Sequence, residues 1–195
     1  MNTSAESRSM SQTLTGIRRS ARLSTCGLYR FTLTRTWDSR PTLLVCMFNP
    51  SAADHTVDDP TITLLCQIAS HNGYGGIVVV NGIPLRSPKP AEAIDMVNTW
   101  DQRQAWDERD ALQANLGEIQ TQVEQAGAVL LAWGALADRC SFWFDNVLEE
   151  IGSALPDGAS LYCLGKTAGG YPKHPLARGK HKVRKDATLI PWRTA

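Results

Sequence analysis

Apolar residues along the chain fall into short continuous runs separated by amphipathic segments. The continuous runs are typical of strands buried on both faces of a parallel sheet, and apolar spacings of three and four residues predict helices between them. This alternation predicts an α/β fold, a three-layer α/β/α sandwich around a mainly parallel central sheet. The expected buried strands are 42–48, 75–83, 128–134 and 160–165, and the expected helices are 60–73, a short one from about 87, 100–127 and 135–155.

The segment before the first buried run has a different pattern. In 28–37 the apolar Tyr29, Phe31 and Leu33 alternate with polar residues that include Arg30. Strict alternation predicts a half-exposed strand, with Arg30 on its solvent side. Residues 1–26 are rich in Ser, Thr and Arg, and we expect a flexible basic arm with order only near residues 16–23. Residues 27–195 are expected to form a single domain.

Composition narrows the class of protein. A chain of 195 residues suits one domain of ordinary size, and 43% hydrophobic residues is normal for a globular protein. No apolar run reaches the ~18–20 residues of a membrane-spanning helix, and the N-terminus lacks the apolar stretch of a secretion signal. The five cysteines form no CxxC pair, so we expect reduced thiols, a cytoplasmic location, no metal and no cofactor. We also expect a monomer with no membrane partner.

Charge is distributed unevenly along the chain. Residues 1–40 have a balance of +5 and residues 160–195 a balance of +7, whereas 41–159 have −11. Two basic ends favour contact with a polyanion as much as they favour two solvated tails. The segment 173–185 favours the first interpretation, contact with a polyanion, because Lys or Arg occupies six of its thirteen positions around an apolar Leu176. Such density favours phosphate binding, and DNA is the expected partner.

Polar residues follow each of the buried runs. Asn49 follows the first and Asn81 ends the second, Trp133 and Gly134 end the third, and His174 lies in the loop after the fourth. Ligands of open α/β sheets bind beyond the carboxyl ends of the strands. The sequence therefore predicts one site on this edge of the sheet, although Asn49 before Pro50 is by itself more typical of a turn.

Several common sites are absent from the sequence. No glycine-rich phosphate loop and no GxSxG motif occurs, and Ser51 follows a proline instead of lying in a glycine-flanked turn. His55 with Asp54, Asp58 and Asp59 offers metal ligands, but an acidic loop followed by a helix cap explains these residues more simply. We therefore predict no metal site.

Four of these segments together resemble the uracil-DNA glycosylase superfamily. The segments are "MFNPS" (47–51), "VVVN" ending at Asn81, "LLAWG" (130–134) and "KHPLARG" (173–179), in the order and spacing of that superfamily. They resemble even more closely a related family of uncharacterised bacterial and phage domains, over roughly residues 42–180. The N-terminal arm lies outside the resemblance.

The resemblance implies a DNA glycosylase that extrudes one nucleotide and hydrolyses its N-glycosidic bond. In its catalytic set, Asn49 would orient the water, Asp58 or Asp59 would share that role unless it caps the next helix, and His174 would hydrogen-bond the leaving base. Phe48 or Tyr74 would stack on the base, and Asn81 would read its polar edge. The residues expected to contact DNA are Lys173, Leu176, Arg178, Lys180 and Lys182, with Leu176 or Arg178 filling the gap left in the stack.

The sequence also departs from the superfamily pattern. Met47 replaces the first glycine of its first motif, and Ser51 replaces the bulky residue that keeps 5-substituted bases out of a uracil pocket. These differences predict a modified base as substrate, a 5-substituted pyrimidine such as the hydroxymethylated or glycosylated ones of phage DNA, and a role in antiviral defence. The alternatives are a non-catalytic nucleic-acid-binding domain of the same fold, a uracil or mismatch repair glycosylase, and an enzyme of free nucleotides.

Overall fold

One mixed sheet forms the centre of the molecule. The structure is a computed structural model that describes residues 16–51 and 56–192. Within these residues the strand order is β1-β2-β4-β3-β5-β6-β7, and the four middle strands are parallel, as predicted. β1, β2 and β7 extend the sheet with antiparallel pairing. The strands are β1 (Arg18–Leu23), β2 (Arg30–Thr36), β3 (Thr42–Met47), β4 (Gly76–Asn81), β5 (Ala128–Leu131), β6 (Ser160–Cys163) and β7 (Ile190–Pro191).

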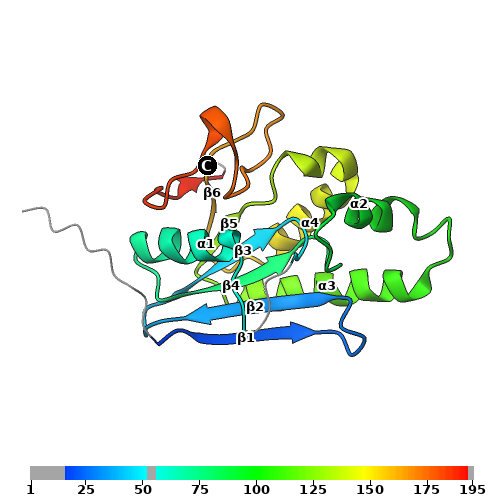
Figure 1. Cartoon of the computed structure of the whole chain (residues 1–195), viewed down its shortest axis with the longest axis horizontal. Helices are drawn as coiled ribbons and strands as arrows, with labels where there is room; N and C mark the ends of the chain where they lie inside the picture. The colour runs from blue at the N-terminus through cyan, green and yellow to red at the C-terminus, as the bar shows by residue number, and fades with distance from the viewer. Residues whose placement is uncertain (1–15, 52–55, 193–195) are drawn as a thin grey trace, which may run out of the picture.

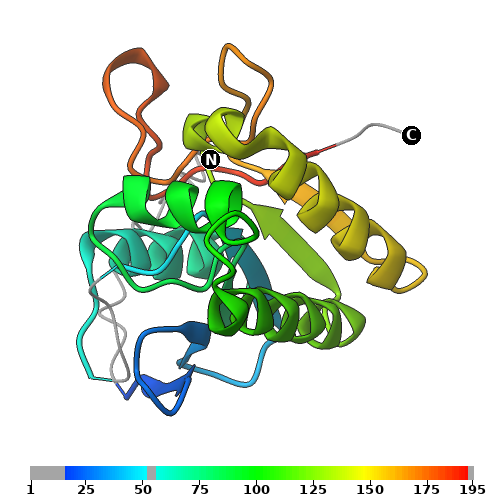
Figure 2. The same ribbon diagram turned by 90° about the vertical axis from the view of Figure 1, so that its right-hand side faces the viewer.

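Helices cover both faces of this sheet, which confirms the predicted three-layer architecture. Helix α1 packs on one face together with the C-terminal segment, and the remaining α-helices pack on the other. Figures 1 and 2 show this division, with the C-terminal loops on the side of the molecule away from β1. The helices are α1 (Pro60–His71), α2 (Pro90–Thr99), α3 (Trp106–Glu124) and α4 (Ser141–Ala154), with 3-10 turns η1 (Ala135–Cys140) and η2 (Gly179–His181).

Strand β3 illustrates why the apolar runs are continuous. Leu44 and Cys46 join the core cluster under α2, α3 and α4, whereas Leu43 and Val45 join the cluster under α1. Successive side chains of a strand point to opposite faces. A strand covered on both faces therefore needs apolar residues at every position, and β3 has them.

Residues 16–23, where the sequence predicted order within the N-terminal arm, belong to the described part of the chain. Residues 18–23 form β1, which pairs along the outer edge of β2, and residues 1–15 lie outside the described residues. Arg22 places its guanidinium 4.6 Å from the centre of the Phe31 ring and forms an ion pair with Glu118 on α3. Backbone pairing and the packing of this arginine hold a strand that has few apolar residues of its own. β2 therefore lies between β1 and β4 in the sheet.

Helix α3 begins later than predicted, at Trp106 instead of residue 100. Residues 100–105 form a turn in which Gln104 has a positive φ of 52°, and the amide of Ala105 donates to the carbonyl of Trp100. The reason is that α2 continues to Thr99 and Trp100 is its C-cap, so the chain has to reverse before α3 starts. Apolar spacing alone does not reveal this interruption.

The cysteines are free, as expected. Cys46, Cys66, Cys140 and Cys163 are buried, and Cys26 is exposed. Burial raises the pKa of Cys46 to about 12, so its thiol stays protonated and unreactive at neutral pH. In the part of the chain that the structure describes, no helix combines the length and the apolar character needed to cross a membrane.

Gly82, directly after β4, allows a close approach that the core depends on. A Cβ atom at this position would lie 2.5 Å from Cε1 of Phe144. We predict that Gly82→Ala lowers the free energy of unfolding by about 1–3 kcal/mol, because the overpacked ring must shift. The control is Gly117→Ala within α3, where a Cβ meets no atom within 4 Å; it should raise stability by up to about 1 kcal/mol. Urea unfolding measures both, and an unchanged Gly82→Ala protein would contradict the packing described.

Candidate functional site

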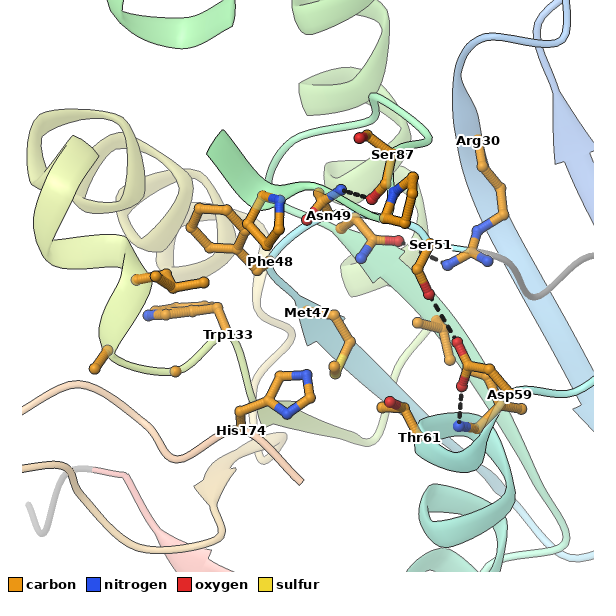
Figure 3. A pocket seen from close by; sticks show the side chains of 18 residues that line it. Arg30, Met47, Phe48, Asn49, Ser51, Asp59, Thr61, Ser87, Trp133 and His174 are labelled. Atoms are coloured by element: carbon orange, nitrogen blue, oxygen red, sulfur yellow. Dashed lines mark hydrogen bonds between the residues drawn. The ribbon is translucent and has the colours of Figure 1, made fainter. Parts of the chain in front are cut away.

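The exits of four neighbouring strands surround one cavity of about 400 Å³. The chain after β3, the end of β4, the chain after β5 and the loop after β6 all contribute to its wall, as the sequence predicted for this edge of the sheet. Figure 3 shows Phe48, Asn49, Trp133 and His174 placed around this space. The residues used below that line it are Arg30, Phe48, Asn49, Ser51, Asp59, Asn81, Trp133, Gly134 and His174.

Asn49 is held by its amide nitrogen. Nδ2 donates to the carbonyl oxygens of Pro50, Leu85 and Ser87 at 3.0, 3.2 and 2.9 Å. Carbonyl oxygens only accept, so the atom that faces them has to be the NH₂ group. The orientation of the amide is therefore fixed, and within the described residues no donor reaches Oδ1. Asn49 offers the cavity a hydrogen-bond acceptor.

Asn81 is oriented in the opposite sense. Its Oδ1 accepts a hydrogen bond of 3.0 Å from the guanidinium of Arg30, which has no acceptor atoms. The NH₂ group of Asn81 is left for the cavity, and no described residue accepts from it. The backbone here is fixed as well, because Asn115 on α3 donates to the carbonyl of Asn81 at 2.8 Å and Trp143 on α4 donates to that of Gly82 at 2.9 Å.

His174 supplies a second donor. Its Nδ1 accepts from the backbone N–H of Leu176 at 3.0 Å, so in the neutral ring the proton is on Nε2. Burial lowers the pKa of His174, which the charge of Asp59 partly opposes. Gly134 makes room for this side chain, because a Cβ there would lie 3.0 Å from Cβ of His174, and its φ of 84° also suits glycine. Figure 3 shows the imidazole projecting toward Met47 and Phe48.

Aromatic residues build one wall of the cavity. The Phe48 ring stacks on Phe144 of α4 with centroids 5.1 Å apart and planes 13° from parallel. Trp133 packs against the same ring at 5.2 Å, tilted by 44°. A rigid aromatic wall beside fixed polar groups is typical of sites that bind planar ligands.

Asp59 caps helix α1 and also lines the cavity. Oδ1 accepts from the backbone N–H of Ile62 at 2.9 Å and so caps α1, with Pro60 at the first helical position. Oδ2 accepts from the hydroxyl of Ser51 at 2.9 Å. Both residues line the cavity, so the cap also brings a negative charge and a small side chain to its wall.

Two predicted site residues are not brought to the cavity. Asp58 turns away and forms an ion pair of 2.6 Å with Arg35, a fully buried residue of β2. Tyr74 precedes β4, and it packs against the core cluster under α1 instead. A residue that precedes a parallel strand lies at the amino-end edge of the sheet, opposite the site, which the sequence interpretation overlooked. These findings correct the expectations for Asp58 and Tyr74.

The basic loop lies beside the cavity and borders a groove of its own, of about 800 Å³. Arg178 and Lys182 line this groove over an apolar floor that includes Leu64 of α1 and Val183. Leu176 also lines it and is 42% exposed. Lys180 is exposed, whereas Lys173 is half-buried and packs near Gly165. The structure thus places four of the five expected DNA contacts on one exposed loop.

Metal ligands do not cluster in the described residues: no group of three His, Cys, Asp or Glu side chains is positioned to hold an ion there. His55 and Asp54, which the sequence offered as ligands, lie outside the described residues.

Arg30 is the site residue that sequence reasoning missed. It is only 3% exposed although its place in an alternating strand predicted a solvated side chain. Burial lowers its pKa to about 10, which the charge of Asp59 opposes, so it remains a cation at neutral pH. The sequence has no local signal of this burial, because the hydrogen bond of Arg30 joins it to Asn81, 51 residues further along the chain.

The fold and site define an α/β protein with a polar, aromatic-walled pocket at the carboxyl edge of a parallel sheet. The chain belongs to the family described as "Protein of unknown function (DUF1643)", whose model matches residues 30–176. All residues that line the cavity fall within the matched region. No curated protein and no solved structure is significantly similar to the chain.

The half-buried imidazole of His174 leads to a prediction about pH. Its pKa should lie below the usual 6.5 in the folded protein, with the neutral ring protonated on Nε2. As the pH falls below about 6.5, the unfolded chain binds a proton before the folded one does, so the free energy of unfolding should fall until the pH passes the lowered pKa. ¹⁵N-detected NMR of the ring gives the pKa and the tautomer, and His174→Phe should abolish this part of the pH dependence. A pKa at or above 6.5 would contradict the site geometry.

Proposed function

We propose that this protein is a DNA glycosylase related to the uracil-DNA glycosylase superfamily. The observation that carries the proposal is the fixed pattern of hydrogen-bonding groups around the cavity: the acceptor Oδ1 of Asn49, and the donors Nδ2 of Asn81 and Nε2 of His174. The aromatic wall of Phe48 and Trp133 suits a flat ring between these groups. The resemblance of the four segments to that superfamily supports the same conclusion.

The proposed reaction needs no strong base. The bond between C1′ of the sugar and the base nitrogen breaks, its electron pair leaves with the base, and the sugar becomes cationic. Water then bonds to C1′ and loses a proton, and the departing base anion takes up a proton, so the products are a free base and an abasic sugar. Oδ1 of Asn49 orients this water, while the N–H groups of His174 and Asn81 stabilise charge on the leaving base.

A neutral His174 suits this role. The Nε2–H group donates a hydrogen bond while the imidazole is neutral, and the lowered pKa of His174 keeps the ring neutral at physiological pH. Asp59 contributes a negative charge near the site of the sugar cation, although its two oxygens are already engaged by Ile62 and Ser51. We therefore assign Asp59 to holding the pocket wall and α1 in place.

Ser51 favours a base with a substituent at position 5. It occupies the place where the superfamily pattern has a bulky residue, and its small side chain is drawn toward Asp59. We propose a 5-substituted pyrimidine, of the hydroxymethylated or further modified kinds found in phage DNA, and hence a role in antiviral defence. Formation of abasic sites in uracil DNA alone would refute this substrate while leaving the reaction class intact.

Asn49→Ala tests the reaction. We predict that base release from duplexes carrying modified pyrimidines falls by roughly 10²–10³-fold, because the water loses its orienting oxygen, while DNA binding is kept. The variant also leaves the carbonyls of Leu85 and Ser87 without the donor that Asn49 provides, at a stability cost of about 1–3 kcal/mol.

Asn72→Ala is the matched control for that loss. The Asn72 amide likewise donates to two backbone carbonyls, of Ile68 and Ala187 at 2.8 Å each, but it lies away from the cavity. It should lose comparable stability and keep base release. If Asn49→Ala releases base at the wild-type rate, Asn49 has only a structural role, holding the chain after β3 to the chain after β4. If the wild type releases no base from any DNA that it binds, the non-catalytic alternative is favoured.

Salt dependence tests the DNA contacts of the basic loop. Each phosphate contact contributes about 0.9 to the slope of log affinity against log salt concentration. We predict that Arg178→Gln and Lys182→Gln each reduce the slope by about 0.9, measured by fluorescence anisotropy with duplex DNA. Arg109→Gln is the control, because Arg109 is exposed on α3 and stacks over Trp106. Equal slopes for all three variants would refute phosphate binding by this loop.

A further inference from the structure

Arg30 is a buried cation in the wall of the cavity. It begins β2 and is 3% exposed, and its backbone N–H donates to the carbonyl of Pro84 at 3.0 Å. Removing a guanidinium from water costs several kcal/mol. A chain that needed only a filled core would have an apolar residue here. What distinguishes Arg30 is the bond from its NH2 atom to Oδ1 of Asn81.

This bond restricts what Asn81 can offer a ligand. An asparagine amide presents an oxygen on one side and an NH₂ group on the other, and in a neutral environment it can turn over to suit a donor or an acceptor. In this pocket, a turned amide would place its NH₂ group against the N–H groups of Arg30. It would also lose a charge-assisted hydrogen bond, which is among the stronger hydrogen bonds in proteins. The amide of Asn81 is therefore locked with its donor toward the cavity.

The donor of Asn81 is not alone. His174 also presents an N–H group, and its tautomer is fixed by the backbone N–H of Leu176. Asn49 is the acceptor that the proposed reaction assigns to water. Of the three polar groups whose orientation is fixed, the two left to recognise a base are thus donors, contributed by β4 and by the loop after β6.

We propose that Arg30 is a specificity-determining residue that acts through Asn81, and that it selects pyrimidines with a carbonyl oxygen at position 4 over those with an amino group there. A 4-oxo base accepts from Nδ2 of Asn81, whereas a 4-amino base brings N–H against N–H. This inference rests on the proposed function and narrows its substrate to 5-substituted uracils. The guanidinium charge also strengthens the Asn81 donor as negative charge builds on the leaving base.

The test compares two duplexes that differ only at the target base. One has 5-hydroxymethyluracil and the other 5-hydroxymethylcytosine, and single-turnover release of each base is measured. We expect the 4-oxo base to be released at least roughly 10²-fold faster by the wild type, as is usual when a site must leave a buried donor unpaired. Equal rates, or faster release of the 4-amino base, would overturn the inference.

Two substitutions identify Arg30 as the cause. In Arg30→Gln a neutral amide can face Asn81 with either end, so Asn81 can turn, and the preference should fall to within about 10-fold. In Arg30→Lys a donor-only cation remains, and the preference should be kept even if both rates decrease. If both variants lose overall activity but keep the wild-type ratio of the two release rates, Arg30 is only structural. Circular dichroism confirms that each variant is folded.

Failure of the reaction is distinguishable from failure of this inference. If the wild type releases neither base, the proposed function fails, and the affinities of the wild type for the two duplexes decide the inference. At least roughly 10-fold tighter binding of the 4-oxo duplex, reduced in Arg30→Gln, would support selection by Arg30 in a binding domain. Equal affinities would overturn it.

Discussion

Three carbonyl oxygens converge on the amide nitrogen of Asn49, and the geometry of the cavity depends on them. The carbonyls belong to Pro50, Leu85 and Ser87, so one side chain ties the chain leaving β3 to the chain that follows β4. The backbone adds a parallel connection, since the amides of Gly82 and Ser87 donate to the carbonyls of Met47 and Pro50. These bonds determine where the aromatic wall and the polar groups stand relative to each other.

The same principle orients each polar group of the pocket. Asn49 faces acceptors only, Asn81 faces a donor-only guanidinium, and Nδ1 of His174 faces a backbone N–H. In each case the partner permits one orientation, so the groups turned toward the cavity need no rearrangement when a ligand arrives. Fixed dipoles of this kind are the usual source of transition-state stabilisation. The buried cation of Arg30 is the energetic cost of that arrangement.

Much of the fold was predictable from the sequence because burial leaves a strong pattern. The continuous apolar runs gave the parallel strands, and the rule that ligands meet the carboxyl ends of strands gave Asn49, Asn81, Gly134 and His174 as neighbours. The sequence left Asp59 open between a helix cap and a catalytic role, and the structure shows that it caps α1.

The remaining features depend on long-range pairing, which a local pattern does not record. Arg30 is buried against Asn81 and Arg35 against Asp58, although alternation placed Arg30 in solvent. Asp58 was wrongly assigned to the site for the same reason, because it pairs with the buried Arg35 instead of approaching the cavity. Tyr74 was misplaced for a different reason, since it precedes its strand and lies at the opposite edge of the sheet.

The most direct test of the account is a crystal structure of the Asn49→Ala protein bound to a duplex with one 5-hydroxymethyluracil. The account predicts that this base is extruded and lies in the cavity against Phe48. Its two carbonyl oxygens should be within hydrogen-bonding distance of Nδ2 of Asn81 and Nε2 of His174, with phosphates along the loop that contains Arg178. A base that remains stacked in the duplex, with the cavity filled only by water, would contradict the account.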